Sequence, residues 1–98
     1  MSSTYIPADV RRAVENRDGH RCVYCQRSRG VMTLDHVTPE VDGGPTEAGN
    51  LVVCCEWCNN RKGSIDMDLF ARFLERRGFG PWRAIVKRVN LHLKTPTE

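Results

Sequence analysis

Two Cys-x-x-Cys pairs constrain the fold of this chain more than any other feature of its sequence. Cys22 and Cys25 form the first pair, Cys55 and Cys58 form the second, and 29 residues separate the pairs. Two residues between thiolates let both sulfurs face one tetrahedral ion, and two such pairs fill all four of its positions. The spacing therefore predicts a structural Zn²⁺ site with no open coordination position.

The fifth cysteine, Cys54, directly precedes the second pair. Its spacing to Cys58 suits a zinc knuckle less well than that of Cys55, so we expect a small buried residue, with a ligand as the alternative. An odd number of cysteines also fits a disulfide framework poorly. The first ten residues lack the basic and then apolar pattern of a secretory signal. We therefore expect a cytoplasmic location, where clustered cysteines more often bind metal.

The length of 98 residues allows one domain, 1–98, near the size at which a metal often supplements a small core. It leaves no room for a TIM barrel, a full dinucleotide-binding domain or a kinase. No apolar run approaches the roughly 20 residues of a membrane helix. We therefore expect no membrane partner.

Charge is distributed unevenly around a formal net value of +3. Residues 1–34 carry six Arg and three acids, residues 35–60 carry five acids and no Lys or Arg, and residues 61–98 carry nine bases and four acids. An acidic centre between basic flanks suits a cation site within a surface that binds a polyanion. The alternative is that these charges are solvated helix faces.

The chain before the second cysteine pair predicts a helix and two short strands. Pro7 begins an apolar pattern at helical spacing over 7–18, and Gly19 is a natural stop. The segments 31–36 and 50–54 have the apolar, β-branched content of strands. Between them lies a loop, 39–49, with the turn signal Gly43-Gly44-Pro45.

Helices are predicted for the rest of the chain. One runs from Cys55 to Gly63 and carries the second cysteine pair, and another follows the N-cap Asp66 as far as Gly78. A last helix begins at Trp82 and places its apolar residues on one face. We expect its aromatic residues, and those of the preceding helix, to pack in the core rather than to stack on bases.

Residues between the cysteine pairs suit phosphodiester hydrolysis, which needs a base and a cation held in register. His36 can be the base, because histidine is largely neutral at pH 7. Asp35 is a hard oxygen ligand suited to Mg²⁺ or Mn²⁺. Neighbouring strand residues point to opposite faces, so one can reach a metal while the other faces the water. Asn59 directly follows a zinc-ligating cysteine, which would hold its amide oxygen in place.

Together these residues resemble the HNH endonucleases of the ββα-metal (His-Me finger) type. The resemblance covers about residues 6–64 and leaves a helical extension at about 65–95. It rests on several motifs in order: Arg17-Asp18-Gly19, the cysteine pairs, Asp35-His36, Gly43-Gly44, Asn50-Leu51 and Cys58-Asn59-x-x-Lys62. It implies an α+β fold with a ββα core clasped by the four-cysteine zinc knuckle, one N-terminal helix and two C-terminal helices.

The resemblance also implies roles for single residues. His36 would be the general base, and Asp35 and Asn59 would hold one catalytic divalent ion. Asn50 would brace the loop between the strands and so orient His36. Lys62 would contact phosphate or the developing charge, and Arg61 would assist it.

The third motif position departs from the eponymous pattern, because Asn59 stands where His is usual. Some family members also carry Asn there. The departure affects metal preference more than activity, since an oxygen ligand favours Mg²⁺ or Mn²⁺ over Zn²⁺ at the catalytic site. The implied products are 3′-hydroxyl and 5′-phosphate ends.

The expected partner is DNA, read with weak sequence specificity because no separate DNA-reading module is visible. Arg61, Arg83 and Lys87 are candidates for phosphate contacts, as are Arg11 and Arg12. Small proteins of this kind resemble phage or restriction-associated nucleases, some of which work beside a packaging terminase. Cutting both DNA strands would need two active sites, which a homodimer or two independent nicks could supply. A larger assembly with a terminase also stays open. The alternative function is a zinc-stapled nucleic-acid-binding module without turnover.

Overall fold

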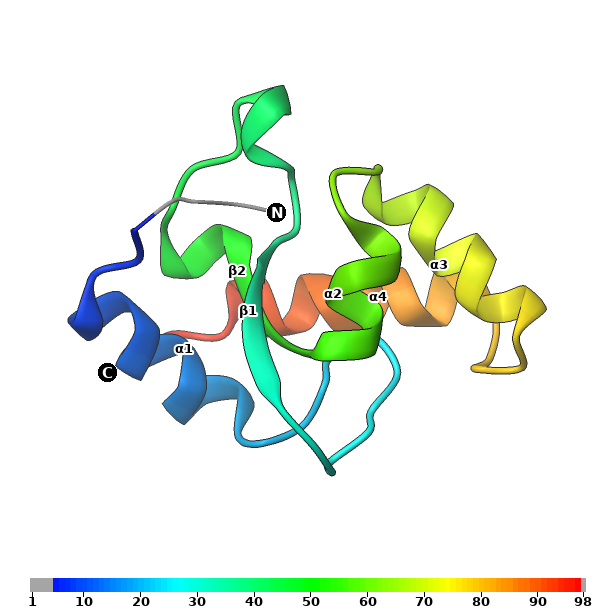
Figure 1. Ribbon diagram of the computed structural model, residues 1–98, viewed down its shortest axis with the longest axis horizontal. Helices are drawn as coiled ribbons and strands as arrows, with labels where there is room; N and C mark the ends of the chain where they lie inside the picture. The colour runs from blue at the N-terminus through cyan, green and yellow to red at the C-terminus, as the bar shows by residue number, and fades with distance from the viewer. Residues whose placement is uncertain (1–4, 98) are drawn as a thin grey trace.

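The computed structural model describes residues 5–97 and confirms the predicted α+β class. Two strands and four helices follow the expected order, with two short 3₁₀ turns between the strands (Figure 1). The elements are α1 (Ala8–Asp18), β1 (Met32–His36), η1 (Glu40–Asp42), η2 (Ala48–Asn50), β2 (Leu51–Cys55), α2 (Glu56–Lys62), α3 (Met67–Arg76) and α4 (Trp82–Lys94). Within 5–97, none of the helices has the length and apolarity to cross a membrane.

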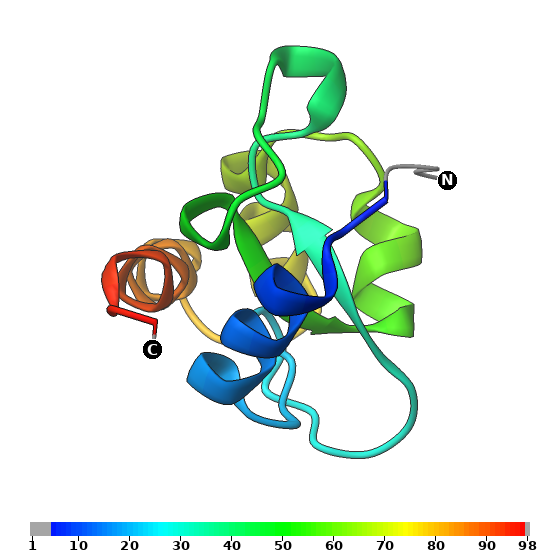
Figure 2. The same ribbon diagram turned by 90° about the vertical axis from the view of Figure 1, so that its left-hand side faces the viewer.

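An antiparallel hairpin of β1 and β2 organises the molecule. Its register pairs Met32 with Cys55 and His36 with Leu51. Side chains alternate along a strand. Leu34, Leu51 and Val53 therefore pack on Val14 of α1, while Val52 faces the core formed with α3 and α4. Figure 2 shows α4 on one side of the hairpin and α2 on the other. By its core contacts, the hairpin is covered by α1 on one face and by α2, α3 and α4 on the other.

Several element boundaries differ from those predicted. β2 includes Cys55, which the sequence pattern assigns to the helix, and its thiol accepts a hydrogen bond from the backbone N–H of Cys58 at 3.4 Å. The extended backbone of Cys55 lets it end the strand and cap the helix at once. The N-cap role of Asp66 is confirmed, because its carboxylate accepts from the backbone N–H groups of Asp68 and Leu69.

Arg17 and Asp18, at the end of α1, form a buried ion pair that ties α1 to other parts of the chain. The Arg17 guanidinium donates to the Asp18 carboxylate at 2.7 Å and to the backbone carbonyls of Ala48 and Leu51. The same carboxylate accepts from the backbone N–H of Val53 at 3.0 Å. The pair gives the Arg17-Asp18 motif a structural role, because it fastens α1 to the start of β2.

His92 belongs to no sequence motif, and it lies on α4. Its Nδ1 atom lies 2.8 Å from the Asp18 carboxylate, so α4 joins the same buried cluster. Burial raises the pKa of Asp18, but the hydrogen bonds from Arg17, from Val53 and from His92 outweigh burial and leave that pKa below its ordinary value. The spacing of 74 residues between the partners leaves no local signal in the sequence.

The four paired cysteines lie together, as the spacing predicts. Their sulfurs are within 4.8 Å of one another, and Cys25 Sγ lies 3.7 Å from Cys55 Sγ. Thiolates about 2.3 Å from a tetrahedral zinc ion are about 3.8 Å apart, so the cluster could hold Zn²⁺. Cys54 is fully buried outside the cluster, as predicted.

The charges of these thiols indicate what a cation would add. A hydrogen bond from Cys58 lowers the pKa of Cys22 to about 5, and the same contact raises the pKa of Cys58. Burial raises the pKa of Cys25 to about 11. The Cys22 thiolate therefore suppresses ionisation of Cys58, and a divalent cation at the centre of the cluster would remove that penalty.

The loop between the strands is held by one side chain, Asn50. Its amide oxygen accepts from the Thr38 N–H at 2.9 Å, and its amide nitrogen donates to the carbonyls of Thr38 at 3.0 Å and Pro45 at 2.9 Å. Gly44 lies against the same point, where an added Cβ would be 1.8 Å from the Thr38 carbonyl oxygen. Position 44 therefore requires glycine, because the Thr38 backbone lies too close for any side chain there.

We predict that Gly44→Ala lowers the free energy of unfolding by about 1–3 kcal/mol, because the backbone must move away from Thr38. Gly49→Ala is the matched control, since a Cβ there meets nothing within 4 Å. Urea unfolding of both variants measures the difference. Equal stability of the two variants would show that the loop yields without cost.

We predict that Cys58→Ser removes bound zinc and unfolds the chain, because a structural zinc site contributes on the order of 10 kcal/mol. Cys54→Ala, beside the cluster, should keep one zinc per chain and lose far less stability. Zinc content by mass spectrometry and thermal unfolding by circular dichroism report both. If Cys58→Ser melts like the parent chain, the cluster has no structural role.

Candidate active site

The candidate site lies at the end of β1, where Asp35 and His36 are neighbours. Strand alternation turns their side chains to opposite faces of the hairpin. Asp35 faces Tyr24 and α2, whereas His36 faces the loop between the strands. This opposite orientation suits the predicted division into a metal ligand and a base, because each group has its own surroundings.

The Asp35 carboxylate is buried and bonded on one oxygen. Its Oδ2 atom accepts from the Tyr24 hydroxyl at 2.6 Å and lies 3.1 Å from the ammonium of Lys62. Burial raises the pKa of Asp35, although the Lys62 charge and the Tyr24 hydrogen bond oppose that shift. Burial and the Asp35 charge raise the pKa of Tyr24 well above its ordinary value. The phenol therefore stays a neutral donor.

The His36 imidazole lies under the loop. Its Nε2 atom is 2.9 Å from the Thr46 hydroxyl oxygen, and its Nδ1 atom is 4.0 Å from a carboxylate oxygen of Glu40. Thr46 lies next to the point that Asn50 braces, because Asn50 bonds the carbonyl of Pro45. The loop brace therefore fixes the group that orients the imidazole.

Lys62 does not lie where a phosphate contact is expected. Only 1% of it is exposed, and its Nζ donates to the His36 carbonyl oxygen at 3.0 Å. The ammonium of Lys62, at the end of α2, thus contacts both the Asp35 carboxylate and the His36 backbone. We correct the expected role accordingly: in this structure Lys62 holds the two site residues in register and does not face solvent.

Asn59 and Arg61 lie on α2 beside this lysine. Asn59 is half-buried and follows Cys58, so the cysteine cluster sets its position on the helix. Its side chain has no hydrogen-bond partner among the described residues. Arg61 is exposed, and its guanidinium lies over the Trp57 ring at 5.3 Å.

The other two candidates for phosphate contact, Arg83 and Lys87, lie exposed on α4. The guanidiniums of Arg83 and Arg72 both lie over the Trp82 ring, at 4.8 Å and 4.3 Å from its centroid. Among residues 5–97 neither arginine is ion-paired with a carboxylate. Stacking holds both guanidiniums in place while their N–H groups stay available.

A divalent cation fits the donors of this site. Asp35 offers a carboxylate and Asn59 an amide oxygen, which are the ligands that Mg²⁺ and Mn²⁺ prefer. Both polar contacts of the Asp35 carboxylate within the described residues fall on Oδ2. The second oxygen, Oδ1, is therefore the one that a cation would take.

Three residues near the site were not identified from the sequence. Tyr24 lies between two cysteines, Thr46 lies in a polar loop, and Arg88 lies on α4. The Arg88 guanidinium donates to the Val23 carbonyl at 2.8 Å and to the Tyr24 carbonyl at 2.6 Å. Each contact joins segments distant in the chain, so local pattern carried no signal for it.

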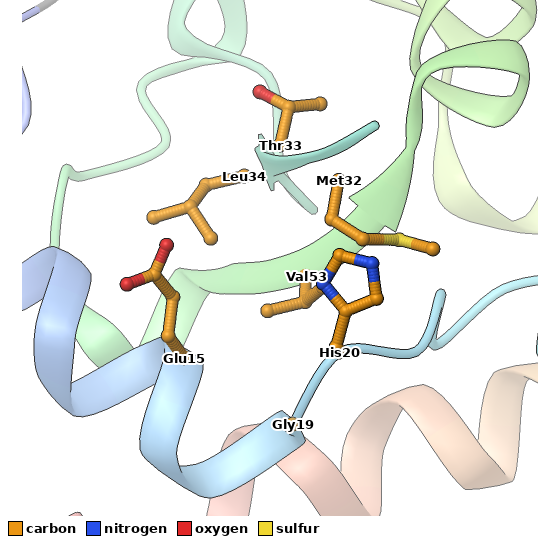
Figure 3. Close-up of a pocket in the computed structure, with 7 residues that line it drawn as sticks. All are labelled: Glu15, Gly19, His20, Met32, Thr33, Leu34 and Val53. Carbon is orange, nitrogen blue, oxygen red and sulfur yellow. The ribbon is translucent and has the colours of Figure 1, made fainter. Parts of the chain in front are cut away.

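A separate cavity of about 240 Å³ lies between α1 and the hairpin (Figure 3). The Glu15 carboxylate and the His20 ring border an apolar floor that includes Leu34 and Val53. Its lining residues are Glu15, Gly19, His20, Met32, Thr33, Leu34 and Val53. The cavity therefore contains none of the predicted catalytic residues.

Comparisons with known proteins agree with this geometry. Residues 22–64 match the model of the family described as HNH endonuclease. A segment covering 55% of the chain is 37% identical over 57 residues to the CRISPR-associated endonuclease Cas9 of Actinomyces naeslundii, and it covers 5% of that protein. The crystal structure of the Type II-C Cas9 enzyme from Actinomyces naeslundii superposes on 99% of the chain with a TM-score of 0.60 and 25% identity.

The chain spans only 14% of that solved structure, so the likeness concerns one small part of a much larger protein. Within that part, the family match runs from Cys22 past Lys62 and includes every predicted catalytic residue and zinc ligand. The hairpin, the helix after it and the cysteine cluster have the arrangement that the family implies. Residues 22–64 of this chain therefore match the HNH endonuclease family in sequence, and the fold of the chain is similar to one part of a Cas9 enzyme.

Proposed function

We propose that this chain is a metal-dependent endonuclease that hydrolyses phosphodiester bonds in DNA. The observation that carries the proposal is the meeting of Asp35, His36 and Lys62 at the end of β1, with Asn59 on the adjoining helix. The family of residues 22–64 and the likeness to a CRISPR-associated endonuclease support it.

His36 acts as the general base in this proposal. Thr46 engages Nε2, so Nδ1 is the nitrogen that takes a proton from water. The Glu40 carboxylate, 4.0 Å away, faces the imidazolium that results. The hydroxide attacks phosphorus in line, the bond to the 3′ oxygen breaks, and that oxygen takes a proton from solvent to become the 3′-hydroxyl.

Asp35 and Asn59 would hold the catalytic Mg²⁺ or Mn²⁺. When bound, the cation would supply positive charge for the phosphoryl oxygen and for the departing 3′ oxygen. Lys62 keeps the carboxylate of Asp35 and the backbone of His36 at a constant separation. The products would carry 3′-hydroxyl and 5′-phosphate ends.

Contacts to DNA are proposed for the exposed cations on α2 and α4. Arg61, Arg83 and Lys87 lie outside the buried clusters, and stacking on Trp57 and Trp82 holds the two arginines. Phosphate contacts of this kind position a protein without reading sequence. We therefore propose weak sequence specificity.

A zinc-stapled binding module without turnover is the second candidate function. The four-cysteine cluster and exposed arginines would serve it equally well. Nothing in such a module requires a carboxylate and an ammonium to converge in the interior beside the backbone of a buried histidine, where unpaired charge is costly. That convergence favours the enzyme.

We predict that wild type nicks supercoiled plasmid DNA with Mg²⁺ or Mn²⁺ and that His36→Ala lowers the rate at least about 100-fold, because general bases contribute about 10²–10⁴-fold. His20→Ala is the matched control and should cleave like wild type, since among residues 5–97 the His20 side chain bonds only the Gly30 carbonyl. Gel analysis of nicked and linear products measures both. A wild type inactive with every divalent ion tested leaves the binding module as the function.

We also predict that Lys62→Met slows cleavage without changing the salt dependence of DNA binding, because its ammonium is buried. Arg61→Gln should leave the buried Lys62–Asp35 pair intact. It should reduce the slope of the logarithm of the DNA-binding constant against the logarithm of the salt concentration by about 0.9. Fluorescence anisotropy in the His36→Ala background isolates binding from cleavage. If Lys62→Met reduces the slope as much as Arg61→Gln does, Lys62 contacts phosphate after all.

A further inference from the structure

The first cysteine knuckle includes a residue, Tyr24, that hydrogen-bonds the carboxylate of Asp35. This residue lies between Cys22 and Cys25, it is fully buried, and its hydroxyl donates to Asp35 Oδ2 at 2.6 Å. The Asp35 oxygen left for a cation is the other one. The hydrogen bond therefore fixes how the carboxylate rotates about its axis.

Tyr24 is itself held from both sides. Its ring meets the Phe70 ring of α3 edge to face, with centroids 5.2 Å apart. Its carbonyl accepts from Arg88 of α4 at 2.6 Å, and the preceding residue, Val23, bonds Val53 of β2 through its backbone N–H at 2.9 Å. The phenol has little freedom to turn away from Asp35.

Two of these supports, Phe70 and Arg88, lie outside the segment 22–64 that matches the family. The C-terminal helices α3 and α4 therefore do more than cover apolar surface. They hold the backbone and the ring of the residue that contacts the candidate metal ligand.

We propose that Tyr24 is a positioning residue that orients Asp35 for the divalent cation, and that Arg88 of α4 supports it. The proposal rests on Asp35 being a metal ligand, as in the proposed function. A hydrogen bond from outside the coordination sphere to a ligating carboxylate sets its orientation, and losing one typically costs about 10–100-fold in metal affinity or activity.

Tyr24→Phe tests this most directly, because it removes one hydroxyl and keeps the ring on Phe70. Tyr5→Phe is the matched control, since Tyr5 is 79% exposed. The probe is Mn²⁺ added to the zinc-loaded full chain without DNA, and electron paramagnetic resonance counts the free ion. We expect Asp35→Asn to abolish binding and Tyr24→Phe to need about tenfold more Mn²⁺.

Arg88→Met gives a second route, because it removes the two backbone hydrogen bonds without touching Tyr24 or Asp35. It should weaken Mn²⁺ binding in the same direction as Tyr24→Phe but by less. Zinc content and thermal unfolding confirm that each variant is folded. A purely structural role would lower the melting temperature and leave Mn²⁺ affinity unchanged.

The proposal is overturned if Tyr24→Phe binds Mn²⁺ as tightly as wild type does. It is also overturned if Asp35→Asn leaves Mn²⁺ binding unchanged. Cleavage assays separate this result from the nuclease itself. DNA cleavage with unchanged metal dependence in Tyr24→Phe refutes the positioning role and keeps the nuclease. Weakened Mn²⁺ binding without any cleavage by wild type keeps the positioning role and refutes the nuclease.

Discussion

The four-sulfur cluster is the constraint on which the rest of this structure depends. It joins the segment before β1 to the junction of β2 and α2, so it closes the hairpin onto the helix that follows it. A hairpin and a helix of seven residues are each marginal alone. One ion held by the four sulfurs would close them together and place Asn59 and Lys62 opposite β1 at small cost in conformational entropy.

Buried charges do the finer positioning inside that closure. Arg17 and Asp18 anchor α1 to the start of β2, and Lys62 and Asp35 lock α2 to the end of β1. A buried charge without its partner is strongly destabilising, whereas a satisfied pair contributes more to a unique arrangement than to net stability. In both pairs the cation also donates to backbone carbonyls, so the pairs set the register of main chain segments.

The parts of the fold that could be predicted were those with a local signal. Cysteine spacing indicated the cluster, and apolar periodicity placed α3 and α4, with Asp66 as a cap and Phe70 and Leu74 buried. The resemblance to a family added roles for Asn50 and Lys62. The brace at Asn50 matches its implied position, whereas the burial of Lys62 does not match a contact with phosphate.

What escaped prediction were the contacts between distant segments that no motif marks. Nothing near His92 in sequence suggests a partner, yet it meets Asp18 across 74 residues. Tyr24 and Arg88 escaped for the same reason, since a tyrosine between two cysteines and an arginine on a helix face have many uses. Such partners become visible only when the fold is known.

The position of Lys62 has a consequence for how the site handles charge. Its ammonium lies 3.1 Å from the carboxylate that is the candidate metal ligand, so it balances that carboxylate in the metal-free fold. A divalent cation arriving at Oδ1 would meet a carboxyl group that is already oriented, but beside a fixed positive charge. Tyr24 contributes orientation without charge. The site thus combines one partner whose charge favours the ionised form of Asp35 with another that aims the carboxylate, and the second partner is supported by helices that lie beyond the family core.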